Sequence, residues 1–304
     1  MAEDVSLIDA HVHLYPPEVN RDPAGWAAAH GEKHWALLCT RKRKTGQPVQ
    51  TFPDVGALLR SMDGAGVERA ILLGWYWEHP ETCALQNTFY AACVAAHPDR
   101  LSAFATFHPA AGRAASLREV QRAADAGLIG LGELSPPAQG YRMDDPLFAT
   151  VLERAADLHL PVNLHVTDPA SRPYPGKVET PLAGLVRLAR AHARTNFILA
   201  HWGGRLPLVA NEPLPGNLHY DTAASPLLYP ETIWREFFNR VPAERVLFGS
   251  DHPLNLYPAI DTEPELARLV AEAHRAGLTA GELRGLMGEN ARRLLRLPAP
   301  ARRP

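Results

Sequence analysis

Lysine, cysteine and long apolar runs are all scarce in this chain of 304 residues. Its three cysteines form no CxxC pair and no even-numbered set, which predicts free thiols in a reducing compartment and excludes a disulfide framework. The formal net charge of −2 gives no basis for binding nucleic acid or an anionic membrane surface. A single basic run, RKRK at 41–44, contains no interleaved aromatic residues, so we expect a solvent-exposed loop there.

No stretch approaches the roughly 18 unbroken apolar residues that a membrane span needs. The first residues, MAEDVSLIDA, lack the basic and apolar regions of a signal peptide. We therefore expect a cytoplasmic protein that acts on a small molecule, without a nucleic-acid or membrane partner. Assembly into a homodimer is left open.

Short apolar and β-branched runs alternate with longer amphipathic ones along the whole chain. Eight such runs predict strands, at 5–13, 69–75, 101–107, 129–134, 161–166, 196–202, 218–223 and 245–251. Strands that alternate with helices within one domain-sized chain predict an α/β fold, a (β/α)8 TIM barrel, with a doubly wound open sheet as the alternative.

We expect a single domain over residues 1–304, because no change in composition marks a second one. Residues 15–53, rich in Trp, Pro and charge, would be a loop segment inserted after the first strand, as a lid or an interface. The last residues, 298–304, read LPAPARRP with the preceding leucine and predict a disordered tail.

The first strand carries unusual polarity in the stretch LIDAHVHL at 7–14. Asp9, His11 and His13 occupy every second position, so a regular strand would place all three on one face. A short HxH motif is weak evidence alone, since a strand end in contact with solvent gives the same pattern.

Other predicted strands also end in polar residues: Glu133, His165, His201 and Asp251. In a barrel these strand ends surround one mouth, where catalytic groups lie. Imidazole nitrogens and carboxylate oxygens are ligands for Zn²⁺ and similar ions, and burying so many of them without an ion would be costly. His201 alone could be a core histidine and Glu133 alone a helix cap. Together they predict a metal site formed by His11, His13, Glu133, His165, His201 and Asp251.

Several motifs on these strands resemble the amidohydrolase superfamily: IDAHVHL, NLHV, ILAHWGG, VLFGSDHPL and the C-terminal LMGENARRLLRL. The resemblance is to its amidohydrolase-related (amidohydrolase 2) branch, which contains TIM-barrel metal-dependent hydrolases and decarboxylases similar to aminocarboxymuconate-semialdehyde decarboxylase. It implies His11, His13, His165 and Asp251 as ligands of a single metal, with His201 poised over the attacked group.

In two-metal relatives, a residue of the fourth strand bridges the ions, either a carbamylated lysine or a glutamate. Lysine occurs here only at 33, 42, 44 and 177, away from every predicted strand end, which excludes a carbamate bridge. Glu133 occupies the position of the bridging glutamate, so the resemblance leaves the metal count at one or two.

The ligand set predicts a hydrolase that uses Zn²⁺, with Mn²⁺ or another divalent ion as an alternative. A bound metal lowers the pKa of its water toward about 7. Asp251 would be the general base and His201 would hold the attacked carbonyl oxygen. We expect cleavage of an amide, lactone or ester bond in a small cyclic or carboxylate-bearing substrate. The alternatives are non-hydrolytic decarboxylation of an aromatic or unsaturated acid and, more weakly, a catalytically silent metal-binding scaffold.

Aromatic and basic residues follow the predicted strands and would form the rim of the substrate site. We expect substrate contacts from Trp75, Tyr141, Arg142, Tyr174 and Lys177. Arg142, Lys177 or the nearby Arg172 would bind a substrate carboxylate.

Overall fold

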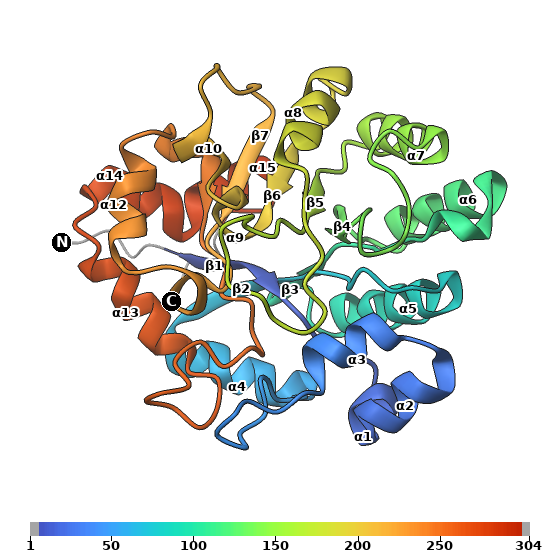
Figure 1. The fold of residues 1–304 in the computed structure, drawn as a ribbon, viewed down its shortest axis with the longest axis horizontal. Coiled ribbons are helices and arrows are strands. Elements are labelled where there is room, and N and C mark those ends of the chain that lie inside the picture. Colours follow the sequence, from blue (N-terminus) through green and yellow to red (C-terminus); the bar gives the residue numbers. More distant parts are fainter. Residues whose placement is uncertain (1–5, 300–304) are drawn as a thin grey trace.

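Eight parallel strands surround the centre of the molecule, and helices cover their outer side (Figure 1). The structure is a computed structural model that describes residues 6–299. The strands are β1 (Leu7–Val12), β2 (Val67–Leu72), β3 (Leu101–Ala103), β4 (Leu131–Leu134), β5 (Val162–Leu164), β6 (Phe197–Leu199), β7 (Leu218–Asp221) and β8 (Val246–Leu247). All eight predicted strands are present, and all except β4 end earlier than expected because the chain turns away from the sheet beyond them.

The strands form two sheets, β1-β2-β3 and β4-β5-β6-β7-β8, which meet at both edges. Ala105 forms a parallel bridge with Leu131 at one seam, and Val12 forms one with His252 at the other. At this second seam the N–H of His13 also donates to the carbonyl of His252 at 2.7 Å. Since both seams are bridged, the predicted barrel is confirmed and the open sheet is excluded.

Helices follow the strands around the outside of the barrel. The α-helices are α1 (Pro17–Arg21), α2 (Pro23–His30), α3 (Lys33–Cys39), α4 (Val55–Ala65), α5 (Pro80–Ala96), α6 (Arg113–Asp125), α7 (Pro146–Asp157), α8 (Leu182–Ala191), α9 (Ala200–Gly203), α10 (Leu206–Val209), α11 (Ser225–Leu228), α12 (Thr232–Phe238), α13 (Leu266–Arg275), α14 (Ala280–Arg284) and α15 (Asn290–Leu294). Short 3-10 helices η1 (Pro109–Ala111) and η2 (Ala243–Arg245) and a π-helix, η3 (Gly285–Glu289), complete the elements.

Side chains along each strand alternate between the barrel interior and the helix layer. On β6, Phe197 and Leu199 pack with the helix layer, and Ile198 between them packs in the interior. Asp9 departs from the pattern expected for β1, because the register of this strand is irregular between Asp9 and Val12. Its carboxylate accepts the backbone N–H of Ser250 at 2.9 Å instead of joining the two histidines that follow it.

The insertion at 15–53 is a folded unit rather than an open loop. Its helices α1, α2 and α3 lie together beside α5 at one side of the barrel (Figure 1). Trp26 and Trp35 are buried in a cluster with Trp77, which follows β2. Three large aromatic side chains bury enough apolar surface to fix short helices that would be unstable alone. Whether the insertion acts as a lid or an interface stays a prediction.

The structure also bears on the cysteines, on membrane-spanning helices and on the C-terminal tail. Cys39, Cys83 and Cys93 are free and buried, which confirms the predicted thiols. Within residues 6–299, no helix has the length and apolar character that crossing a membrane requires. The predicted tail, 298–304, lies outside the described residues apart from its first two positions.

Candidate metal centre and active-site cavity

Four histidines and two carboxylates converge at one end of the barrel. Nε2 of His11 lies 3.2 Å from Nε2 of His13, and Nε2 of His201 lies 3.2 Å from Nδ1 of His165. The structure thus brings together all the residues that the sequence placed at strand ends: His11, His13, Glu133, His165, His201 and Asp251. Parallel strands that begin at one end of a barrel deliver the residues that follow them to a common mouth.

Glu133, on β4, lies between the two pairs of histidines. Its Oε1 is 2.9 Å from Nδ1 of His165 and 3.5 Å from Nε2 of His201. Its Oε2 is 3.7 Å from Nε2 of His13 and 3.9 Å from Nε2 of His11. Each pair, taken with Glu133, forms a group whose ligand atoms lie within 4.8 Å of one another.

Asp251 follows β8 and faces both pairs from the side of the cavity. Its Oδ1 lies 3.5 Å from Nε2 of His13 and 3.7 Å from Nε2 of His11, while Oδ2 lies 4.0 Å from Nδ1 of His201. Burial raises the pKa of Asp251 to about 6. Its side chain is 13% exposed, so the carboxylate can reach a molecule in the cavity.

The outer ring nitrogens of three histidines already have acceptors. Nδ1 of His11 lies 2.9 Å from Oδ2 of Asp221, and Nδ1 of His13 lies 2.9 Å from the carbonyl of Leu73. Nδ1 of His201 faces a backbone carbonyl at 3.1 Å. An acceptor at Nδ1 fixes the ring proton there, so Nε2 presents a lone pair to the centre. This donor set fits a divalent metal ion.

The charges of the centre also favour a cation. Burial and the neighbouring His11 lower the pKa of His13 to about 3, so His13 is a neutral ligand. Burial would raise the pKa of Glu133, but His165 and His11 bring it well below its ordinary value. Burial opposes protonation of His11, yet the carboxylates of Asp221 and Glu133 raise its pKa to about 10. The buried carboxylates therefore favour positive charge in this centre. A metal ion can supply that charge in place of the second proton on the His11 ring.

The sequence analysis missed Asp221, which lies near the end of the seventh predicted strand, 218–223, and is the last residue of β7. Its side chain is fully buried and accepts hydrogen bonds from His11 and from the backbone N–H of His201. The rule that identified the other residues, a polar side chain after an apolar strand, would have found it.

A cavity of about 900 Å³ opens over the metal-binding group. It is lined on one side by the insertion and on the other by the segments after β2, β5, β6, β7 and β8, including Arg41, Arg43, Gln50, Trp75, Tyr76, Asp168, Arg172, Tyr174, Arg205, Tyr229 and Leu254. Trp75 and Tyr76 stack with ring centroids 4.4 Å apart. Their aromatic faces form an apolar wall that suits a planar ring.

Only some of the expected substrate contacts line this cavity. Trp75 and Tyr174 do. Tyr141 instead packs on Phe148 in the helix layer, with ring centroids 5.5 Å apart. Arg142 and Lys177, which were also predicted to contact the substrate, do not line the cavity either.

The loop after β4 turns away from the mouth, so the guanidinium of Arg142 points to solvent and pairs with Asp144 at 2.6 Å. The ammonium of Lys177 donates to the carbonyl of Ser171 at 2.8 Å and is absent from the cavity wall.

The basic run at 41–44 is another correction, because its arginines and lysines point in opposite directions. Lys42 and Lys44 are exposed, whereas Arg41 and Arg43 line the cavity. Arg43 donates to the carbonyl of Asn255 at 2.9 Å, which fixes the loop on the segment after β8. Among the described residues Arg41 has no ion-pair partner, and its Nε is buried without a hydrogen bond. A free, partly buried guanidinium in a cavity is suited to binding a carboxylate.

Comparisons with known proteins give the family of the chain and solved structures of similar fold. The sequence profile of the family described as Amidohydrolase matches residues 8–297. No curated protein sequence matches the chain. Among solved structures, the 5-carboxyvanillate decarboxylase LigW from Sphingomonas paucimobilis is similar with a TM-score of 0.73 and 20% identity, over 97% of this chain and 100% of that one.

Two further decarboxylases have similar structures. A 5-carboxyvanillate decarboxylase from Novosphingobium aromaticivorans, complexed with manganese and 4-hydroxy-3-methoxy-5-nitrobenzoic acid, has a TM-score of 0.75 and 16% identity, over 97% of both chains. A 2,6-dihydroxybenzoate decarboxylase from Rhizobium has a TM-score of 0.66 and 21% identity, over 96% of this chain and 99% of that one.

These similar structures overturn the hydrolase expected from the sequence, because most of those named by activity are decarboxylases of aromatic acids. The error has a physical cause. Histidines and carboxylates around a divalent ion serve hydrolysis and decarboxylation alike, so the ligands do not specify which bond breaks.

Proposed function

The chain belongs to the amidohydrolase family, and we propose that it catalyses the metal-dependent, non-hydrolytic decarboxylation of an aromatic carboxylic acid. The observation that carries the proposal is the position of the metal-binding group under the stacked wall of Trp75 and Tyr76. A planar acid lying against that wall can direct its carboxylate to the cation. The similar decarboxylase structures support this choice over the other reactions of the family.

We propose one divalent cation, held by His11, His13, His165 and Asp251, with Glu133 between the histidine pairs. Two carboxylates facing the centre balance the charge of one such ion, whereas two ions would leave excess positive charge. Manganese is the first choice, since two similar decarboxylases are complexed with it, and zinc is the second. When bound, the cation supplies a Lewis acid that orients the acid and withdraws electron density from it.

The cavity supports an acid with a second anionic group. Arg205 is neutralised by Asp168 at 2.6 Å, and Arg43 donates to backbone carbonyls. Of the two lining arginines that have no ion-pair partner among the described residues, Arg172 is exposed and Arg41 is partly buried, so Arg41 is the better placed to bind a second carboxylate. A carboxylate bound by Arg41 would fix the ring in its plane while the other end of the molecule meets the cation.

Decarboxylation needs a proton at the ring carbon that bears the carboxylate. When that carbon is protonated, the bond to the carboxylate breaks, its electron pair restores the aromatic ring, and CO₂ leaves. Asp251 is placed to deliver the proton, because it lines the cavity and its Oδ1 faces His11 and His13 while its Oδ2 lies 4.0 Å from His201.

The test measures whether the carboxylate leaves as CO₂ and whether a solvent proton replaces it on the ring. Enzyme loaded with Mn²⁺ or Zn²⁺ is incubated in D₂O with 5-carboxyvanillate and with 2,6-dihydroxybenzoate. We expect CO₂ release and one deuterium at the carbon that lost it, with no solvent oxygen in the aromatic product. Absence of CO₂ from both acids, with turnover of a lactone or amide instead, would contradict the proposal.

A further inference from the structure

The buried carboxylate of Asp221 binds two separate parts of the candidate site at once. Oδ2 lies 2.9 Å from Nδ1 of His11 and accepts the side-chain amide of Asn163 at 3.1 Å. Oδ1 accepts the backbone N–H groups of His201 at 3.0 Å and Ala223 at 3.1 Å. All four partners donate, so a carboxylate is the side chain that satisfies this position.

The contact with His11 determines which ring nitrogen faces the centre. Since Oδ2 only accepts, Nδ1 of His11 must carry a proton, and in the neutral ring that binds a cation Nε2 is left with its lone pair. That Nε2 is the atom 3.2 Å from Nε2 of His13. Without an acceptor at Nδ1, the ring could rotate or carry its proton on Nε2, and it would then be unable to bind a cation.

The contact with His201 holds a backbone segment in an unusual conformation. Residues 201–205 all have positive φ, between 56° and 61°, and form a left-handed turn in which the N–H of Gly204 donates to the carbonyl of His201 at 3.0 Å. Glycine adopts this conformation freely, but His201, Trp202 and Arg205 do so only when other bonds compensate.

Each of these three residues has such a bond. Trp202 donates its ring N–H to Ser225 at 2.9 Å, and Arg205 pairs with Asp168. For His201 the bond is the one to Asp221.

We propose that Asp221 is a positioning residue that sets His11 and His201 relative to each other through its two oxygens. The inference rests on the metal centre of the proposed function. It assigns no chemical step to Asp221, which has no contact with the cavity.

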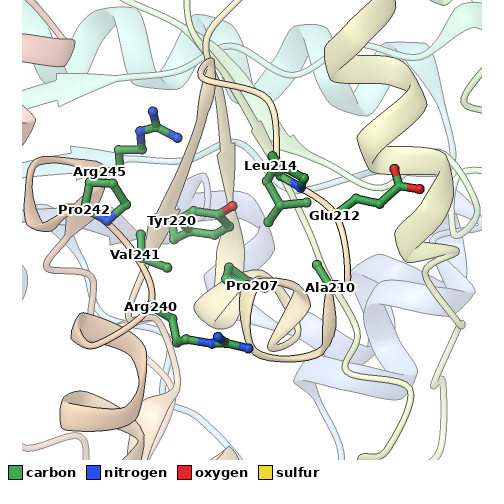
Figure 2. Close-up of a pocket in the computed structure, with 10 residues that line it drawn as sticks. Pro207, Ala210, Glu212, Leu214, Tyr220, Arg240, Val241, Pro242 and Arg245 are labelled. Carbon is green, nitrogen blue, oxygen red and sulfur yellow. The ribbon is translucent and has the colours of Figure 1, made fainter.

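The chain offers a matched control at the preceding position. Tyr220 lies on the same strand with its side chain on the opposite face, in a pocket of about 290 Å³ outside the barrel, between Pro207 and Val241 (Figure 2). Its hydroxyl makes no hydrogen bond with the described residues, so Tyr220→Phe removes one polar atom from β7 without touching the site.

The experiment compares Asp221→Asn, Asp221→Ala and Tyr220→Phe. An asparagine can still accept the backbone N–H groups at Oδ1, while Asn163, whose Oδ1 has no partner, can turn to accept the new amide. The NH₂ group of the new asparagine would, however, face Nδ1 of His11 and donate a hydrogen bond to it, where Oδ2 of Asp221 accepted one. Asp221→Asn should therefore retain the turn at His201 but lose the Nδ1 proton of His11, whereas Asp221→Ala should disturb both.

The readouts are Zn²⁺ and Mn²⁺ affinity by competition with a chelator, and ¹⁵N NMR of labelled histidines. In the unsubstituted protein we expect a hydrogen-bonded Nδ1 proton on His11, with and without Zn²⁺. Both Asp221 variants should lose that signal and bind metal about 10–100-fold more weakly, and Tyr220→Phe should change neither.

A His11 ring that carries no proton on Nδ1 in the unsubstituted protein would overturn the inference, whether or not the variants fold. Unchanged metal affinity in Asp221→Asn would overturn it as well. If the unsubstituted protein binds neither metal, the proposed function fails, while the NMR signal still decides the role of Asp221.

Discussion

Glu133 presents one carboxylate oxygen to His165 at 2.9 Å and turns the other toward the pair formed by His11 and His13. A carboxylate in this position could bridge two ions or stabilise the ligands of one. With Asp251 as the other carboxylate facing the cavity, the charge at the mouth matches a single divalent ion. The number of bound metal ions can therefore be tested by replacing Glu133.

Replacement of Glu133 by Gln should weaken metal binding without changing its stoichiometry. The amide keeps the shape of the side chain but removes one of the two negative charges that face the ion. We expect one equivalent of metal in both proteins and an affinity about 10–100-fold lower in Glu133→Gln. Elemental analysis after dialysis gives the stoichiometry, and chelator competition gives the affinity.

Glu272→Gln is a suitable control, because Glu272 is also buried but accepts from the Trp234 ring N–H at 2.8 Å in the helix layer. Its metal affinity should be unchanged. Two equivalents in the unsubstituted protein and one in Glu133→Gln would instead identify Glu133 as a bridge.

The strand ends were predictable from the sequence because local pattern determines them. An apolar run followed by a histidine or carboxylate places that residue at the barrel mouth, as for His165 and Asp251. Asp221 follows the same rule, so the sequence could have identified it. The position of Asp9 could not be predicted, because the irregular register of β1 changes the face on which side chains lie and leaves no mark in the sequence.

The cavity wall was much less predictable than the metal-binding group. Arg41 faces the cavity and Lys42 faces solvent because the loop is attached to the segment after β8, through Arg43 and Asn255. That attachment joins residues far apart in the chain, so no local pattern encodes it. Tyr141 shows the opposite error, since closeness to a strand end in sequence did not bring it to the mouth.

Arg41→Gln should selectively impair substrates with a second carboxylate. A hydrogen bond to a charged group contributes about 1.5–3 kcal/mol, which corresponds to roughly a tenfold to hundredfold loss in kcat/KM. The loss should occur with 5-carboxyvanillate, which has two carboxylates, and be small with 2,6-dihydroxybenzoate, which has one. Steady-state kinetics with both acids measures the difference.

Lys42→Gln removes the same charge from the exposed neighbour and should leave both substrates unaffected. An equal loss with both acids in Arg41→Gln would mean that Arg41 supports the loop rather than binding the second carboxylate.

His219 should make the protein less stable in mild acid. Burial, with the nearby charges of Arg245 and Arg293, lowers the pKa of His219 to about 4. The unfolded chain takes up the proton near the ordinary value of about 6.5, so stability falls as pH decreases from there toward 4. His219→Gln should reduce the loss between pH 7 and pH 5 by about 2 kcal/mol, measured by urea unfolding at both pH values.

The exposed His274 on α13 provides the comparison, since His274→Gln should keep the same pH dependence as the unsubstituted protein. If His219→Gln lost as much stability in acid as the unsubstituted protein, His219 would be excluded as a cause.

Asp251→Asn should abolish most of the decarboxylation while leaving the barrel folded. The amide cannot deliver a proton from Oδ2, and a missing acid or base commonly costs 10²–10⁴-fold in rate. Because Oδ1 also faces His11 and His13, metal content must be measured and restored before rates are compared. Binding of a nitro analogue of the substrate then separates loss of the proton donor from loss of the ion. A variant that retains metal, binds the analogue and still turns over at full rate would place the donor elsewhere. The next candidate is His201, which lies 4.0 Å from Asp251 and is not one of the four proposed ligands.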